Sequence, residues 1–301
     1  MKKNKKIQHY IEYISLKMLI SFLHLFSINA AKKIGFFLAD IAFVFVPIRK
    51  KHIVDSLTKS FPAKSEQEIK KIAKDVYKQF VCTVVEIIFV SKMTDEQIKN
   101  AVCFENIYLI ERALKQGKGG VIMSAHFGNW EMLALSFAKR YPLSVIVAKQ
   151  ENPYFDNIIN DIRSKRGYKT IYKDVAPLGV LRALKRNEFV AILADQHAGA
   201  QGVYTPFFYR EVSTPKGPAV FALRAKCPLY TGFCARQPDG RYVVTFEEIP
   251  LLDTGDEEKK VEEIMTEYNR ILQRHIEKNP SFWFWFHRRW KSQKPKINVV
   301  N

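Results

Sequence analysis

The segment 126–131, which reads HFGNWE, carries the side chains best suited to chemistry in this sequence. It follows an apolar strand and opens a helix, a position where catalytic groups gather in open α/β sheets. A neutral histidine can take a proton from an alcohol, and a carboxylate beside it can fix the tautomer of the ring. His126 and Glu131 are therefore candidates for a general base and the carboxylate that orients it.

The two side chains can meet only if the backbone bends between them. On a continuous helix this spacing would turn them about 140° apart. Gly128 permits a sharp turn, and Asn129 is a candidate N-cap for the helix that follows. The amides at that helix start would suit an oxyanion or a phosphate. The alternative is a histidine that merely caps the helix, with Glu131 complementing the helix dipole. The spacing suggests no third ligand, so a metal site is a weaker interpretation.

Hydrophobic patterning predicts helices and strands that alternate from residue 106 onward. Ser65 and Thr94 begin capping boxes, and the first predicts a long helix that ends near Ser91. The alternation predicts an α/β fold with a central, mostly parallel sheet and an N-terminal helical extension. The predicted strands cover residues 120–125, 143–148, 169–172 and 189–194, with a hairpin of 229–236 and 241–248, and the later helices cover 106–116, 129–140, 153–165, 177–186 and 256–277.

Composition and charge limit the function classes. The chain has 301 residues, of which 47% are hydrophobic, so it can bury a large core and is not generally disordered. Its four scattered cysteines suit a reducing compartment rather than a disulfide framework. The net charge of +18 is concentrated at the two ends. Such ends can face anionic lipid, nucleic acid or an acidic protein.

The first 60 residues favour a lipid partner. They begin MKKNKK and continue with apolar sequence as far as Pro47, interrupted by Lys17. The uncharged run 18–31 is shorter than the roughly 18–20 apolar residues of a confident membrane span. We predict that residues 1–60 form helices that lie in the membrane interface, with lysines reaching the headgroups. A pair of helices that only caps the core, or a single marginal span, is the alternative.

Several blocks in order resemble one enzyme family. The string SAHFGNWE at 124–131 resembles the histidine-x4-acid motif of the lysophospholipid/glycerolipid acyltransferases. It looks most like the branch that holds the bacterial late acyltransferases of lipid A biosynthesis, which transfer lauroyl and myristoyl groups, and the mycobacterial phosphatidylinositol mannoside acyltransferases. The other matching blocks are RKKHIVDSLTKSFP at 49–62, Asn152-Pro153 with Arg163 and Arg166-Gly167, LADQ at 193–196 followed by PFF at 206–208, TPKGPAVFA at 214–222, and HRRWK at 287–291.

The resemblance implies a glycerolipid acyltransferase-like layered fold and roles for individual residues. It implies that His126 is the base and Glu131 its partner, and that Asp195 lies near the site and organises it. It also implies that Arg163 contacts a phosphate or another anionic group of the substrate, which suits the bidentate fork of arginine. The residues expected at the substrate are Arg163, Arg166, Gly128, Asn129, Asp195 and Gln196.

The expected reaction moves a fatty acyl group from a thioester to a hydroxyl of a lipid A precursor, without a metal or cofactor. The donor is acyl carrier protein or acyl-CoA, and the acceptor lipid sits in an anionic bilayer, on the cytoplasmic face of a bacterial inner membrane. Residues 61–291 would form the catalytic domain and residues 292–301 a basic tail. The same chemistry on a lysophospholipid, an ornithine-type lipid or a glycolipid stays open.

A non-catalytic protein that binds membrane or nucleic acid is the remaining alternative. The run FWFWFHRRWK at 282–291 has aromatics for stacking and arginines for phosphate. No nucleic-acid-binding motif accompanies it, and the same composition marks a membrane interface or the edge of a core. Nucleic acid is therefore not an expected partner.

Overall fold

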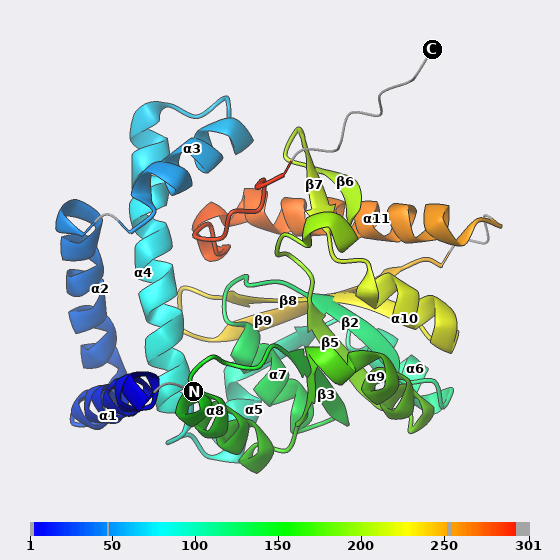
Figure 1. Cartoon of the computed structure of the whole chain (residues 1–301), viewed down its shortest axis with the longest axis horizontal. Helices are drawn as coiled ribbons and strands as arrows, with labels where there is room; N and C mark the ends of the chain where they lie inside the picture. Colours follow the sequence, from blue (N-terminus) through cyan, green and yellow to red (C-terminus); the bar gives the residue numbers. More distant parts are fainter. Residues whose placement is uncertain (1–2, 47, 252–254, 293–301) are drawn as a thin grey trace.

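A seven-stranded sheet forms the centre of the molecule (Figure 1). The computed structural model describes residues 3–46, 48–251 and 255–292. The strand order is β1-β9-β8-β2-β5-β3-β4, and all neighbours are parallel except the β8/β9 hairpin. A separate antiparallel hairpin, β6/β7, lies outside this sheet. The strands are β1 (Val102–Glu105), β2 (Gly120–Ser124), β3 (Leu143–Val147), β4 (Lys169–Tyr172), β5 (Phe189–Leu193), β6 (Val203–Phe207), β7 (Arg210–Thr214), β8 (Leu229–Arg236) and β9 (Tyr242–Ile249).

Helices cover both faces of the sheet, which gives three layers. Every residue of β2 is buried, as expected for a central strand of a parallel sheet. Val121 and Met123 of that strand belong to one core cluster and Ile122 to the other, because successive side chains of a strand point to opposite faces. The helices of these layers are α5 (Asp95–Ala101), α6 (Tyr108–Lys115), α7 (Trp130–Ala138), α8 (Pro153–Lys165), α9 (Ala176–Lys185), α10 (Gly217–Ala225) and α11 (Glu257–Lys278).

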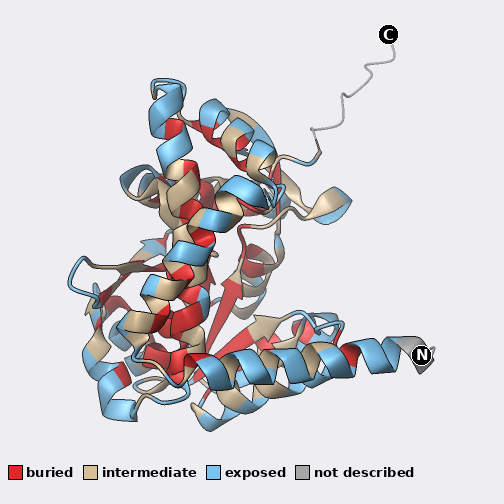
Figure 2. Cartoon of the chain, turned by 90° about the vertical axis from the view of Figure 1, so that its left-hand side faces the viewer, coloured by how far each residue is buried: buried red, intermediate tan, exposed pale blue. Residues whose placement is uncertain are grey.

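Four helices precede the sheet and stand at one side of it (Figure 1). They are α1 (Lys3–Leu23), α2 (Ile28–Phe45), α3 (Lys50–Ser60) and α4 (Glu66–Val90). Helix α2 packs along α4, and a Cβ on Gly35 would lie 2.7 Å from a methyl group of Val81 on α4. Helix α1 contacts α8 and is exposed along most of its length (Figure 2). Across the described ranges, no helix has both the length and the hydropathy that a membrane crossing requires.

The structure confirms the expected α/β class and most of the expected elements. Helix α4 begins after a complete capping box at Ser65, and α5 after another at Thr94. Strand β1 and the β6/β7 hairpin were not predicted. Strand β1 is short and mostly solvent-exposed, so it lacks the apolar signal of a buried strand, and its pairing with β9 defines it. The basic tail predicted for 292–301 lies outside the described residues, apart from Ser292.

Candidate active site

The turn between β2 and α7 holds the predicted base. Gly128 has φ +58°, and a Cβ there would lie 1.9 Å from the backbone oxygen of Cys234. Only glycine fits, because both the left-handed backbone and the close approach of β8 exclude a side chain. Asn129 caps α7, and its Oδ1 accepts a hydrogen bond from the amide of Met132 at 2.9 Å. The turn therefore has the form expected from the sequence.

Asp195 is the carboxylate that holds His126. The Nδ1 atom of His126 lies 2.9 Å from Oδ1 of Asp195, and the backbone amide of His126 donates to Oδ2 at 3.0 Å. The indole Nε1 of Trp283 donates to the same Oδ2 at 2.9 Å. Asp195 is 2% exposed, so these donors replace the water that a buried carboxylate would otherwise need.

The pair favours the ionised acid and a basic ring. Burial alone would lower the pKa of His126, but the charge and hydrogen bond of Asp195 outweigh it, and the pKa is raised above 6.5. Burial alone would raise the pKa of Asp195, but the charge of His126 and the three donated hydrogen bonds lower it. An ionised carboxylate only accepts, so Nδ1 carries the proton and Nε2 presents its lone pair.

His126 also lines a narrow pocket rich in aromatic residues. The cavity volume is about 10 Å³, which is room for about one water molecule, and Phe80, Phe284 and Trp130 are among the lining residues. The rings of Trp130 and Phe284 lie 5.0 Å and 5.9 Å from the imidazole, centroid to centroid. No residue of the described ranges makes a hydrogen bond to Nε2. The Nε2 atom of His126 is therefore not occupied by a hydrogen bond to another described residue.

Glu131 does not orient the histidine, contrary to the sequence prediction. Its Oε1 is paired with Arg163, and its Oε2 accepts a hydrogen bond from the hydroxyl of Tyr168 at 2.8 Å. Helix α7 carries Glu131 toward α8, away from the hydrogen-bonding edge of the ring. The carboxylate is still close enough to contribute to the raised pKa of His126. The hydrogen bond to the ring comes from Asp195, which the sequence analysis expected near the site.

Arg163 and Tyr168 both contact the carboxylate of Glu131, and this places them next to the candidate site. The charge of Glu131 raises the pKa of Arg163 against the effect of burial, so this guanidinium stays charged. Its Nε is buried without a hydrogen-bond partner among the residues described. The predicted contact of Arg163 with an anionic substrate group stays a prediction, and the sequence analysis did not single out Tyr168.

The sequence analysis expected Gly128 and Asn129 at the substrate, but the backbone amides of both residues form hydrogen bonds within the protein. The amide of Gly128 donates to Phe282 O at 2.9 Å, and the amide of Asn129 donates to Cys234 O at 3.2 Å. The side chain of Asn129 is completely buried and donates to Glu86 at 2.9 Å. Both residues build the turn, and neither contacts the pocket through a free donor.

Glu86 is a buried charge behind the turn that sequence reasoning missed. Its carboxylate pairs with Arg236 at 2.5 Å and with Lys32 of α2 at 2.7 Å. Burial alone would raise the pKa of Glu86, but these cations lower it to about 2. The carboxylate thereby connects α2, α4, β8 and the catalytic turn. The sequence signal that could have identified Glu86 is a glutamate within the apolar stretch of a long helix.

Arg166 and Gln196, two other residues predicted to contact the substrate, form hydrogen bonds with other parts of the protein. Arg166 donates to the backbone oxygen of Val90 at 2.7 Å and pairs with Asp95 at 3.3 Å, so it fastens α8 to the end of α4. The backbone oxygen of Gln196 accepts a hydrogen bond from Arg289 at 3.0 Å. Neither interaction involves the aromatic pocket. No three His, Cys, Asp or Glu side chains within the described ranges gather closely enough to hold a metal ion.

The aromatic and basic run 282–291 is part of the core and the site. Trp283, Trp285 and Arg289 are 2%, 1% and 0% exposed, so they do not present a surface on which bases could stack. The run passes the catalytic turn, and Phe282, Trp283, Phe284 and Phe286 line the pocket. Trp283, Trp285 and Arg289 therefore pack inside the protein, beside the turn that carries His126.

Comparisons with known proteins identify the family of this chain. The family described as "Bacterial lipid A biosynthesis acyltransferase" matches residues 1–292. The lipid A biosynthesis lauroyltransferase of Escherichia coli K12 is 24% identical over 267 residues, which cover 87% of this chain and 85% of that protein. The palmitoleoyltransferase of lipid A biosynthesis from the same organism is 23% identical over 235 residues, 77% of this chain and 76% of that protein.

A phosphatidylinositol mannoside acyltransferase of Mycobacterium tuberculosis is also similar, although over a shorter stretch. It is 28% identical over 155 residues, 49% of this chain and 48% of that protein. The family match extends over nearly the whole chain, including the turn that carries His126 and the strand end that carries Asp195. This chain belongs to the bacterial lipid A biosynthesis acyltransferase family.

Proposed function

We propose that this acyltransferase moves a fatty acyl group from an acyl thioester to a hydroxyl of a lipid A precursor. One observation carries the chemistry: Nδ1 of His126 is held by a buried Asp195, while the ring lines an aromatic pocket. Such an imidazole has a fixed tautomer and a free basic nitrogen at the place where a substrate enters. The family and its named relatives support the acceptor.

His126 begins the reaction as the general base. Its Nε2 takes the proton of the acceptor hydroxyl while the oxygen attacks the thioester carbonyl carbon, which forms the new C–O bond. The resulting imidazolium donates through Nδ1 to Asp195 at 2.9 Å, so its charge is neutralised where it develops. The tetrahedral intermediate then breaks its C–S bond, and the departing sulfur takes the proton from Nε2. The products are the ester and the free thiol.

The pocket supplies the surroundings for this step. Phe80, Phe284 and Phe286 contribute apolar surface beside the imidazole, which suits an acyl chain and keeps water from the thioester. Phe80 is 39% exposed on α4, so the apolar lining reaches the molecular surface. Arg163, beside Glu131, is proposed to contact a phosphate of the acceptor.

We propose that residues 1–60 place the enzyme on the cytoplasmic face of a bacterial inner membrane. Large apolar side chains are exposed on both first helices, for example Met18 at 67%, Phe37 at 66% and Phe45 at 76%. A soluble monomer rarely exposes so many, and lysines nearby suit anionic headgroups. Residues 61–291 then form the catalytic domain, and the basic surface suits an acidic acyl carrier protein as donor, with acyl-CoA as the other donor to test.

A second acceptor class is favoured by one observation. The similarity to a phosphatidylinositol mannoside acyltransferase shows that relatives of this chain differ in the lipid they are named for. The same base and pocket would acylate a lysophospholipid, an ornithine-type lipid or a glycolipid, because the chemistry needs only a hydroxyl within reach of Nε2. The proton transfer and the attack on the thioester do not depend on the rest of the acceptor, which affects only binding.

An acceptor panel tests the proposal. Purified protein is incubated with labelled acyl carrier protein thioester or labelled acyl-CoA, and with a lipid A disaccharide precursor, a lysophospholipid, an ornithine-type lipid or a phosphatidylinositol mannoside. We expect label in the disaccharide lipid and none when His126→Ala replaces the wild type. Label in another lipid alone would move the assignment to that acceptor. No transfer to any lipid from either donor would refute the proposed function.

A further inference from the structure

A segment near the C-terminus crosses the catalytic turn, and we refer to residues 282–289 as the strap. The amide of Gly128 donates to the oxygen of Phe282 at 2.9 Å, and the amide of Phe284 donates to the oxygen of His126 at 2.9 Å. Between these bonds, Phe127 and Trp283 form an antiparallel β-bridge. The strap thus pairs with the turn as a short strand would, and it fixes the backbone on both sides of the base.

The strap also holds the residues around Asp195. The indole of Trp283 donates to the Oδ2 atom of Asp195 at 2.9 Å. Next along the chain, the oxygen of Gln196 accepts from Arg289 at 3.0 Å, and the amide of His197 donates to Nε2 of His287 at 2.8 Å. One segment, more than 80 residues beyond Asp195 in sequence, therefore binds both members of the His126–Asp195 pair.

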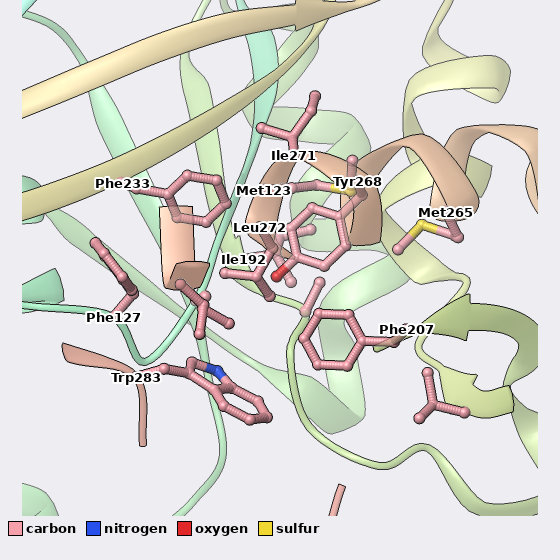
Figure 3. Packing of buried hydrophobic residues seen from close by; sticks show 14 of the residues in the cluster. Met123, Phe127, Ile192, Phe207, Phe233, Met265, Tyr268, Ile271, Leu272 and Trp283 are labelled. Atoms are coloured by element: carbon pink, nitrogen blue, oxygen red, sulfur yellow. The ribbon is translucent and has the colours of Figure 1, made fainter. Parts of the chain in front are cut away.

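Trp283 contributes a side-chain hydrogen bond from the strap to the His126–Asp195 pair. It is 2% exposed and packs edge to face against Phe207 at 5.5 Å (Figure 3). The ring of Trp285 also packs edge to face against it, at 4.8 Å. These rings leave the indole little freedom to turn. An indole N–H donates only and does not titrate, so this hydrogen bond stays the same whether His126 is neutral or protonated.

We propose that Trp283 is a positioning residue for acyl transfer, whose indole N–H fixes Oδ2 of Asp195 so that Oδ1 faces Nδ1 of His126. The inference rests on the proposed function for its catalytic consequence, but the hydrogen bond itself can be tested without a substrate. Without Trp283, Oδ2 keeps the backbone amide of His126 as a donor, and the carboxylate gains freedom to rotate. The orientation of the ring then becomes less defined when the hydroxyl arrives.

The hydrogen bond is tested by NMR of the indole groups. Protein labelled with ¹⁵N in its four tryptophans gives four indole signals, each assigned by a Trp→Phe variant. In Asp195→Asn, a neutral amide replaces the carboxylate, so we expect the Trp283 N–H proton to move upfield by more than any other indole proton. The matched signal is Trp285, which is equally buried but donates to the oxygen of Pro280 at 2.7 Å. An equal response of the two signals would overturn the proposal.

The catalytic consequence is tested by comparing Trp283→Phe with Trp285→Phe. Both variants lose an indole N–H at a buried site of the strap, so their effects on packing are matched. We expect Trp283→Phe to lower kcat roughly tenfold with KM unchanged, because it weakens the orientation of the base rather than substrate binding. We expect Trp285→Phe, which keeps an aromatic ring beside Trp283, to lower kcat clearly less than Trp283→Phe does.

The outcomes separate this inference from the proposed function. Equal kcat values for the two folded variants would overturn the role of Trp283 while acyl transfer by the wild type stands. If the wild type transfers no acyl group, the proposed function fails, and a selective shift of the Trp283 signal still supports the hydrogen bond. If Trp283→Phe does not fold, the NMR comparison on Asp195→Asn decides the matter alone.

Discussion

Nδ1 of His126 lies 2.9 Å from Oδ1 of Asp195, although 69 residues separate them in sequence. The register of the sheet explains the meeting. Strands β2 and β5 are parallel neighbours in which Ser124 pairs with Leu193, and each catalytic residue stands two positions beyond its strand's end. Side chains at the same offset after adjacent parallel strands emerge at the same edge of the sheet. The carboxylate on the neighbouring strand therefore reaches the ring.

We predict that Asp195→Asn lowers kcat by roughly 10³- to 10⁴-fold with little change in the fold. The amide no longer holds the productive tautomer of His126, and it cannot neutralise the imidazolium. Initial rates with labelled acyl thioester and circular dichroism measure the two effects. The control is the carboxylate of Glu131, which makes no hydrogen bond to the His126 ring and instead contacts Arg163 and Tyr168.

Glu131→Gln is expected to cost clearly less in kcat than Asp195→Asn, because it leaves the ring and its partner in place. If Glu131 takes part through Arg163, the change appears mainly as a higher KM for the acceptor. A larger loss of kcat in Glu131→Gln than in Asp195→Asn would return the orienting role to Glu131.

The pH dependence of the rate follows from the pKa of the base. General-base catalysis needs neutral His126, whose pKa is raised above 6.5 by Asp195 in spite of burial. We therefore expect kcat/KM to fall on the acid side, with an apparent pKa above 6.5. In Asp195→Asn the stabilising charge is gone while burial remains, so this limb moves to lower pH. A limb that stays in place would show that another group controls it.

The sequence predicted the turn more completely than it predicted the partner of the base. The roles of Gly128 and Asn129 could be predicted locally, because a sharp turn and a helix cap depend on the residues next to them in sequence. The choice between Glu131 and Asp195 depends on which strands are adjacent, and no local pattern encodes the β2/β5 register. Proximity in sequence favoured the wrong carboxylate.

The position of the strap beside the His126–Asp195 pair was the other feature that could not be predicted from local sequence. Its aromatic and basic composition was visible, but three interpretations of it shared that composition. Burial of Trp283 and Arg289 depends on contacts with residues 195–196 and 213–214, which lie far away in the chain. The first helices behaved differently: their boundaries follow local apolar and capping signals, so their existence was predicted although their packing on α4 was not.

Replacing Gly128 by Ala should prevent the turn from forming. The new Cβ would lie 1.9 Å from a backbone oxygen that cannot move without shifting β8. We expect the free energy of unfolding to fall by about 3 kcal/mol or more. Gly240→Ala is the control, because Gly240 has φ +87° but nothing within 4 Å of a Cβ. It should cost about 1–2 kcal/mol, the backbone strain alone. Equal costs in urea denaturation would contradict the argument.

The buried Glu86 makes stability depend on pH in a definite direction. Its pKa is about 2 in the folded chain, against an ordinary value of 4.5, because nearby cations outweigh burial. A lowered pKa contributes stability that is complete above pH 4.5 and is lost as the pH falls toward 2. The shift corresponds to about 3 kcal/mol. Urea unfolding at several pH values measures this loss.

Lys32→Met removes one of the cations from Glu86 and is expected to cost about 2 kcal/mol at pH 7. The difference from wild type should shrink as the pH falls toward 2, where Glu86 becomes protonated in the folded chain as well. The control is Lys33→Met, on the same helix, whose side chain is exposed and makes no ion pair with any described residue. A cost for Lys33→Met equal to that of Lys32→Met would show that the loss comes from the helix and not from Glu86.

Membrane attachment should depend on one face of α2. Phe37, Leu38, Ile41, Val44 and Phe45 are exposed there, at spacings that place them on a common side of the helix. Burial of two phenylalanines in the interface contributes several kcal/mol, so the double variant Phe37→Ser/Phe45→Ser should bind anionic vesicles at least tenfold more weakly. Co-sedimentation with vesicles of phosphatidylglycerol and phosphatidylethanolamine measures the change.

The same double variant separates attachment from chemistry. Neither phenylalanine lines the pocket beside His126, so transfer to an acceptor dispersed in detergent should keep its wild-type rate, while transfer to an acceptor in vesicles should fall with binding. The control is Tyr209→Ser, because Tyr209 is 79% exposed at the β6/β7 turn and outside the helices proposed to meet the membrane. If Tyr209→Ser weakens vesicle binding as much as the double variant does, the attachment is a general property of exposed aromatic residues, and α2 is not the membrane-facing element.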